Sequence, residues 1–275
     1  MPLSRTAPVG NFSESLQRIS ARASDCAYTE GSILEGAPLE PDILKAPRSA
    51  IYDGCCRRKE LHIRGSAQRP PLPFADYCRI FSVISCVIEE ESVVHHACNF
   101  FAMTGAHILR EHHRLPAIAV SGAAFFSLNP ALYPLAFAEH ANGRVFAGLD
   151  GFHSWIECRG YVIDLLAPLF PENLTEITEH SEVPRRAFIK PLSDMASRLP
   201  QRGDPEGTFF LIPDEACQAN MERTHRKPAT RDLQTVCSTW YQRPPKKMNT
   251  EFHIKDNLGR VMTLRRKDIG IRGFW

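Results

Sequence analysis

Residues 98–122 read CNFFAMTGAHILREHHRLPAIAVSG, in which a helical pattern passes directly into the pattern of a short strand. Apolar side chains recur at helical spacing and predict a helix over about residues 97–113. Pro116 ends that helix, and the apolar run over residues 117–121 predicts a strand that stops at Gly122. Because a loop precedes this segment, its leading cysteine falls in the first turn of the predicted helix.

A second informative stretch, HSWIECRGYVIDLLAP, begins at His153 and predicts strands over residues 153–158 and 161–166. If the Arg-Gly pair between the strands forms a two-residue turn, Trp155 lies opposite Asp164. His153 is then a diagonal neighbour of Asp164 on the same face, within reach of a side-chain hydrogen bond. A three-residue bulged turn would instead place the aspartate on the face opposite the histidine.

Together, these positions suggest the chemistry of a thiol nucleophile. The N–H groups and the dipole of a first helical turn stabilise a thiolate at Cys98. His153 would take the thiol proton, and Asp164 would orient the imidazole, as in the triads of nucleophilic catalysis. The alternative is structural: a free cysteine is often an inert small hydrophobic residue, a histidine at a strand start often belongs to the core, and the aspartate could serve only as a cap or ion-pair partner.

Both stretches resemble segments of transglutaminase-like thiol enzymes. In that family a Cys-headed helix carries Leu-Arg near its end, here Leu109-Arg110, and a Pro-Ala strand closed by glycine follows. The later stretch resembles the family's His-x-Trp-x-Glu strand, which is followed by an Asp strand. The resemblance implies that Cys98 is the nucleophile, His153 the general base and acid, and Asp164 the residue that orients the histidine. It also implies that Trp155 and Glu157 are supporting side chains.

More closely, the chain from about Pro71 onward resembles an uncharacterised bacterial family, domain of unknown function 2026. This resemblance implies an α+β fold of the papain/transglutaminase-like (cysteine proteinase-like) type, with a Cys-headed helix packed on an antiparallel sheet. One departure from papain-like proteases is that no glutamine lies just upstream of the cysteine, where residues 89–92 are three glutamates and a serine. The oxyanion hole would then rely on backbone N–H groups, which leaves proteolysis open but keeps acyl transfer as the expected chemistry.

Two parts of the chain differ in pattern. Residues 1–70 carry scattered proline and glycine with one weak helical stretch, and we expect an irregular, poorly ordered extension. Residues 71–275 should form the domain, starting with a helix from about Pro73. Its later part predicts a strand, two helices and a hairpin over residues 208–212, 214–224, 230–241 and 251–265.

Composition excludes several classes of protein. The 275 residues are 43% hydrophobic with a formal net charge of +2, which excludes wholesale disorder. There is no apolar run long enough for a membrane span and no signal-peptide pattern, so we expect a cytoplasmic protein. The nine cysteines do not have the spacing of a disulfide framework, so we expect reduced thiols. The histidines between residues 107 and 113 lack the zinc-binding HExxH pattern, Cys55-Cys56 is no CxxC motif, and no phosphate-binding glycine loop occurs. We therefore expect no metal and no cofactor.

The charge is unevenly distributed. Residues 221–275 hold 13 lysines and arginines against 5 acidic residues, a net charge of +8, which leaves −6 for the remainder. Because no aromatic residues interleave with these charges, nucleic acid is not the expected partner. The expected function is thiol-dependent acyl transfer, hydrolytic by default, on a peptide or small-molecule amide, ester or thioester. The alternative is a catalytically silent binding module that holds an acidic partner through residues 221–275. The sequence indicates neither the substrate nor the oligomeric state.

Overall fold

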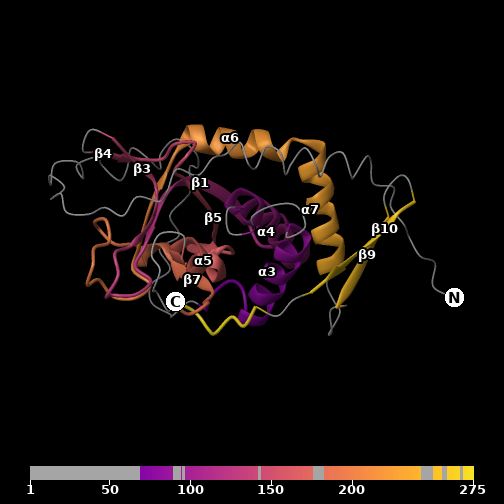
Figure 1. The fold of residues 1–275 in the computed structure, drawn as a ribbon, viewed down its shortest axis with the longest axis horizontal. Helices are drawn as coiled ribbons and strands as arrows, with labels where there is room; N and C mark the ends of the chain where they lie inside the picture. Colours follow the sequence, from indigo (N-terminus) through magenta and orange to yellow (C-terminus); the bar gives the residue numbers. More distant parts are fainter. Residues whose placement is uncertain are drawn as a thin grey trace.

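The computed structural model describes residues 69–88, 94, 97–141, 144–175, 183–242, 250–255, 259–266 and 269–275. It forms a mixed α+β structure, as the sequence predicts (Figure 1). The expected irregular extension falls almost entirely on residues 1–68, and these lie outside the described residues. The elements are α3 (Phe74–Ile88), α4 (Cys98–His113), β1 (Ile118–Phe126), β2 (Leu135–Phe137), β3 (Glu139–Ala141), β4 (Arg144–Phe146), β5 (His153–Cys158), β6 (Tyr161–Asp164), η3 (Ala167–Leu169), α5 (Phe170–Thr175), β7 (Phe188–Pro191), η4 (Leu192–Asp194), β8 (Phe209–Pro213), α6 (Glu215–His225), α7 (Pro228–Tyr241), β9 (Glu251–Lys255) and β10 (Val261–Arg265).

The main sheet is antiparallel and has the strand order β2-β1-β5-β6-β7, with β8 also paired to β1. Gly122 pairs with both His153 and Pro213, so β5 and β8 lie on opposite sides of β1. The prediction that this strand stops at Gly122 is wrong, because β1 continues to Phe126. The glycine marks a close approach instead: a Cβ there would lie 2.1 Å from the backbone oxygen of Ile212.

The hairpin of β5 and β6 has the predicted register. Ile156 pairs with Ile163 and Cys158 with Tyr161, so the turn contains two residues and the bulged alternative does not occur. The turn residues have φ of 51° and 78°, as a two-residue turn with the right-handed twist of the strands requires. The hairpin of β9 and β10 is likewise formed, although its turn residues 256–258 lie outside the described part of the chain.

Helices α3, α4 and α7 pack together and cover one face of the sheet (Figure 1). Gly105 lets α4 approach the sheet, since a Cβ at this position would lie 2.1 Å from Leu165 and 2.8 Å from Ile156. A second core on the other face joins α5 to side chains of the strands, among them Trp155 and Val162. The alternation of side chains along β5 thus connects the two cores through one strand.

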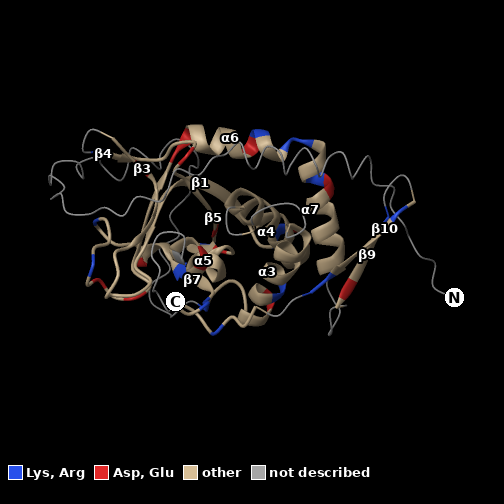
Figure 2. Ribbon diagram, viewed as in Figure 1, with Lys and Arg blue, Asp and Glu red and all other residues tan. Residues whose placement is uncertain are grey.

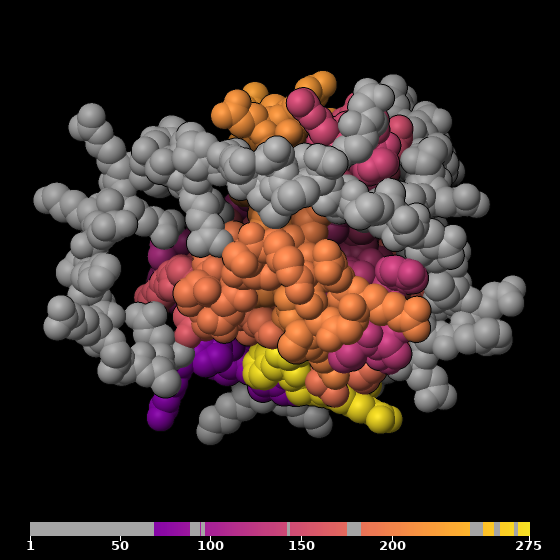
Figure 3. Space-filling model, turned by 90° about the vertical axis from the view of Figure 1, so that its left-hand side faces the viewer, coloured from indigo at the N-terminus to yellow at the C-terminus, as the bar shows by residue number. Residues whose placement is uncertain are grey.

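The C-terminal residues lie against the sheet and the first described helix. Phe274 forms a parallel bridge with Ala187, and the rings of Phe274 and Phe74 meet edge to face at 5.2 Å. Figure 3 shows this segment, in yellow, beside the indigo start of the described chain. The sequence patterns predicted no strand over β7 and no pairing of the C-terminal residues. Within the described residues, no helix is both long enough and apolar enough to span a bilayer.

Candidate active site

Cys98 is the first residue of α4 and is almost fully buried. Ala97 precedes it with φ −92° and ψ 33°, and no side chain caps this end of the helix. The first helical bond runs from Phe101 N–H to the Ala97 carbonyl at 3.0 Å. The thiol therefore sits in the first turn, as predicted, where N–H groups without intrahelical partners point toward the end of the helix.

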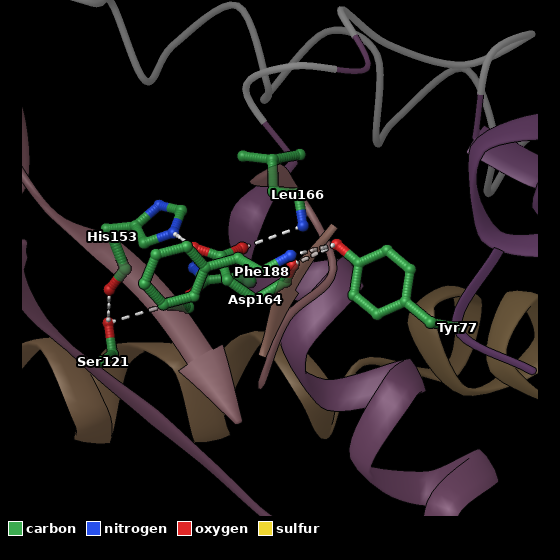
Figure 4. Close-up of polar contacts among 8 residues, drawn as sticks. Tyr77, Ser121, His153, Asp164, Leu166 and Phe188 are labelled. Carbon is green, nitrogen blue, oxygen red and sulfur yellow. Dashed lines mark hydrogen bonds and ion pairs between the residues drawn. The ribbon is translucent and has the colours of Figure 1, made fainter. Parts of the chain in front are cut away.

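His153 and Asp164 form a fully buried pair. The imidazole Nε2 lies 2.6 Å from Asp164 Oδ2, and neither side chain has solvent-exposed surface (Figure 4). The other carboxylate oxygen, Oδ1, accepts the backbone N–H of Leu166 at 2.9 Å. Because both oxygens of Asp164 have partners, the carboxylate is fixed in orientation and holds the imidazole ring in turn.

Tyr77 of α3 secures the backbone beneath this pair. Its hydroxyl donates to the Asp164 carbonyl oxygen at 2.5 Å and accepts the Phe188 N–H of β7 at 3.4 Å (Figure 4). Burial, followed by the charge of Asp164, raises the pKa of Tyr77 well above its ordinary value, so the phenol remains a neutral donor. One helix thus joins the ends of two neighbouring strands.

The pKa of His153 is raised to about 9. Burial is the largest influence and opposes protonation, but the charge and hydrogen bond of Asp164 and then those of Cys98 outweigh it. At neutral pH the ring is therefore an imidazolium ion beside the carboxylate of Asp164.

The second ring nitrogen of His153, Nδ1, is the one that Asp164 leaves unbonded. Nδ1 is buried and has no well-formed hydrogen bond within the described part of the chain. Cys98 is nevertheless close enough to raise the pKa of the imidazole by hydrogen bonding and charge. No His153–Cys98 hydrogen bond meets the usual limits of distance and angle, which is common for a nucleophile and its base before substrate binds.

Three phenylalanines surround the imidazole. Phe137 of β2 stacks on it, with ring centroids 4.4 Å apart and planes inclined by 21°. Phe126 of β1 and Phe170 of α5 meet its ring edge at 5.8 Å each. These rings keep water from the His153–Asp164 pair and strengthen its electrostatic interaction. No sequence pattern predicts this ring of phenylalanines, which we call the phenylalanine box, because its members lie on three separate elements.

The two supporting residues named from the sequence lie on the same face of β5 as the histidine. Trp155 is fully buried in the second core, and its indole N–H donates to Glu157 Oε1 at 3.3 Å. Glu157 stands four residues from His153, a separation of about 13 Å along a strand. Glu157 is therefore a hydrogen-bond partner of Trp155 and lies away from the His153 imidazole.

A second cysteine occupies a first helical turn, in α6. Cys217 N–H donates to the N-cap Asp214 at 2.8 Å. Burial, then Asp214, and then Glu139 and Cys98 raise the pKa of Cys217 to about 12. Its thiol therefore stays protonated at neutral pH, since carboxylates surround it and no imidazolium faces it.

The histidines near the end of α4 have structural partners. His112 Nε2 lies 2.8 Å from Ser238 Oγ, and His113 Nε2 lies 2.6 Å from the Tyr241 hydroxyl, which joins α4 to α7. Among the described residues, no group of three or more His, Cys, Asp or Glu side chains is arranged to hold a metal ion. Cys55-Cys56 lies outside the described residues.

These features define an α+β protein in which a helix tip and two adjacent antiparallel strands bring a cysteine, a histidine and an aspartate together. The chain belongs to the family described as "Protein of unknown function (DUF2026)", whose model matches residues 73–275. The resemblance to this family is thus confirmed. A solved structure, "The crystal structure of genomics APC5867", is similar at 27% identity and a TM-score of 0.66, covering 77% of this chain and 100% of that chain. No curated protein matches the chain.

Proposed function

We propose that this protein is a thiol-dependent acyl-transfer enzyme, hydrolytic by default, with a papain/transglutaminase-like arrangement of its site. Cys98 is the nucleophile, His153 the general base and acid, and Asp164 the group that orients the imidazole. The observation that carries the proposal is the buried His153–Asp164 pair at 2.6 Å, whose remaining ring nitrogen has no well-formed hydrogen bond among the described residues while Cys98 is near enough to raise the pKa of the imidazole. A structural histidine would use both ring nitrogens for well-formed bonds to the core.

The reaction follows from these contacts. His153 Nδ1 holds the proton of Cys98, and the thiolate attacks the carbonyl carbon of an amide, ester or thioester. First-turn N–H groups of α4, including that of Cys98, stabilise the oxyanion. The tetrahedral adduct collapses, and the leaving group departs with the proton from His153. Water, or an amine, then loses a proton to His153 and attacks the thioester, which releases the acyl product and restores the thiol.

The experiment is peptide-resolved alkylation of the native protein with iodoacetamide at pH 6 and pH 9. A free thiol with a pKa of about 8.5 is roughly 0.3% ionised at pH 6, so the same cysteine in urea-unfolded protein reacts slowly there. Paired with an imidazolium, Cys98 should react at least tenfold faster at pH 6 in the native chain than when unfolded. Cys217 is the matched control, because it also lies in a first helical turn but has carboxylates around it and should stay unreactive.

The variant His153→Gln separates the proposal from its alternative. Without the imidazolium, alkylation of Cys98 at pH 6 should fall sharply, while the pH 9 rate should change much less because a thiol of ordinary pKa is then already largely ionised. An unchanged pH 6 rate in a folded His153→Gln chain would overturn the catalytic assignment. Strongly salt-dependent binding of heparin that survives Cys98→Ala would then favour the binding module of residues 221–275. Figure 2 shows both basic and acidic positions on α7, which lies in that region.

A further inference from the structure

The residues that follow the nucleophile and the base in the chain are bonded to each other. Ser154, next to His153, donates from its hydroxyl to Asn99 Oδ1 at 2.6 Å, and Asn99 is next to Cys98. The tip of the nucleophile helix is therefore tied to the strand of the base one residue away from each reacting group.

A third residue ties this link to the neighbouring strand. Ser121 Oγ lies 3.1 Å from Ser154 Oγ and 3.2 Å from the His153 carbonyl oxygen, to which it donates (Figure 4). The backbone of Ser121 is itself held, since its N–H donates to Gln218 Oε1 at 3.1 Å. We call Asn99, Ser154 and Ser121 the hydroxyl link.

The hydroxyl link is buried and has a defined direction. Ser121 has no exposed surface and Ser154 only 2%. A hydroxyl group carries one proton, and a carboxamide oxygen can only accept, so the Ser154 proton is committed to Asn99. The Ser154 oxygen is then left as an acceptor, and the single Ser121 proton is shared between this oxygen and the His153 carbonyl oxygen. The three contacts are thus made through two hydroxyl protons, and a buried hydrogen-bonded network of this kind makes a structure more rigid.

We infer that Ser154 is a positioning residue that sets the distance between the Cys98 thiol and the His153 imidazole; the inference rests on the proposed function. No well-formed hydrogen bond fixes the thiol to the imidazole, and the two groups belong to the tip of a helix and to the first residue of a strand. A shift of about 1 Å between two reacting groups can cost about 100-fold in rate. The hydroxyl link limits such a shift because it holds the neighbouring residue on each side.

The test is the ratio of the Cys98 alkylation rates at pH 6 and pH 9, a quantity that loss of stability alone does not change. Ser154→Ala should lower this ratio about fivefold, the equivalent of about 1 kcal/mol for one hydrogen bond. Ser154→Thr keeps the hydroxyl and should restore the ratio to within about twofold of the wild-type value. Ser127→Ala is the control: Ser127 is equally buried, and its hydroxyl donates to the Asp204 carbonyl at 3.1 Å, outside the hydroxyl link.

Three outcomes would overturn the inference: a ratio within about twofold of wild type in Ser154→Ala, an equal fall in Ser127→Ala, or no recovery in Ser154→Thr. If Ser154→Ala does not fold, Asn99→Ala, at a half-buried position, must give the same fall in the ratio or the inference fails. The variant His153→Gln distinguishes failure of the proposed function from failure of the positioning role of Ser154. If it leaves the ratio unchanged, the proposed function fails; if it collapses the ratio and Ser154→Ala does not lower it, only the positioning role fails.

Discussion

Raising the pH from 6.5 to 9.5 should lower the free energy of unfolding by about 3 kcal/mol through His153 alone. The pKa of this residue rises from 6.5 to about 9 on folding, and one pKa unit is worth about 1.4 kcal/mol. Between these two values the folded chain holds a proton that the unfolded chain has lost, so stability falls as the pH rises. Below pH 6.5 both states are protonated, and the contribution of His153 is present in full.

The measurement is urea unfolding followed by fluorescence of the three tryptophans, at intervals from pH 5.5 to 9.5. The reference is the double variant His153→Gln/Asp164→Asn, which removes both charges of the buried pair and leaves no uncompensated carboxylate. The pKa values of the Cys158 and Cys217 thiols are also raised, by burial foremost, and ionisation in the unfolded state destabilises both chains alike at high pH. Both chains also carry Cys98→Ala, because a proton passed from this thiol to His153 on folding would cancel the uptake by the imidazole. The difference between the chain with the wild-type pair and the reference, both in this background, therefore isolates the pair.

The curve of the chain with the wild-type pair should fall relative to the reference, at up to about 1.4 kcal/mol per pH unit between pH 6.5 and 9. Two curves that stay parallel within about 0.5 kcal/mol would refute the protonated state assigned to His153, and a relative rise with pH would refute its sign. Either result would also remove the imidazolium on which the proposed nucleophile depends.

Three further substitutions test the frame of the site by urea unfolding. Gly122→Ala should cost about 1–3 kcal/mol, at the upper end because the added Cβ meets the backbone of β8 at 2.1 Å, and a neutral result would contradict that close packing. Tyr77→Phe should cost about 1–3 kcal/mol by removing the buried donor to the Asp164 carbonyl, and a stability equal to wild type would mean the bond contributes nothing. Phe137→Ala should cost about 3–5 kcal/mol by opening a cavity against the His153 ring, and a loss below about 1 kcal/mol would show that the box collapses to fill it.

The contiguous parts of the site were predictable because they depend on local pattern. The Arg-Gly pair fixes a two-residue turn, the turn fixes the register, and the register brings His153 and Asp164 to one face. The period of α4 likewise puts Cys98 in the first turn. Each of these inferences spans fewer than twenty residues, within which spacing determines direction.

The supporting parts were not predictable because they come from distant or very short segments. Tyr77 lies 87 residues from the carbonyl that it binds. Phe137 ends a strand of three residues, too short to show any alternation. The glycine at 122 was misinterpreted because a glycine in a strand pattern fits an end and a close backbone approach equally well, and only the position of β8 separates the two.

The phenyl ring stacked on the imidazole also gives the proposed base a spectroscopic signature. At 4.4 Å between centroids and 21° between planes, the ring protons of His153 lie over the face of Phe137, where the aromatic ring current shields them. Among the eleven histidines of the chain, this one should therefore give imidazole resonances displaced upfield. Its protonation could then be followed by nuclear magnetic resonance in the intact protein, with no substrate in hand and no residue replaced.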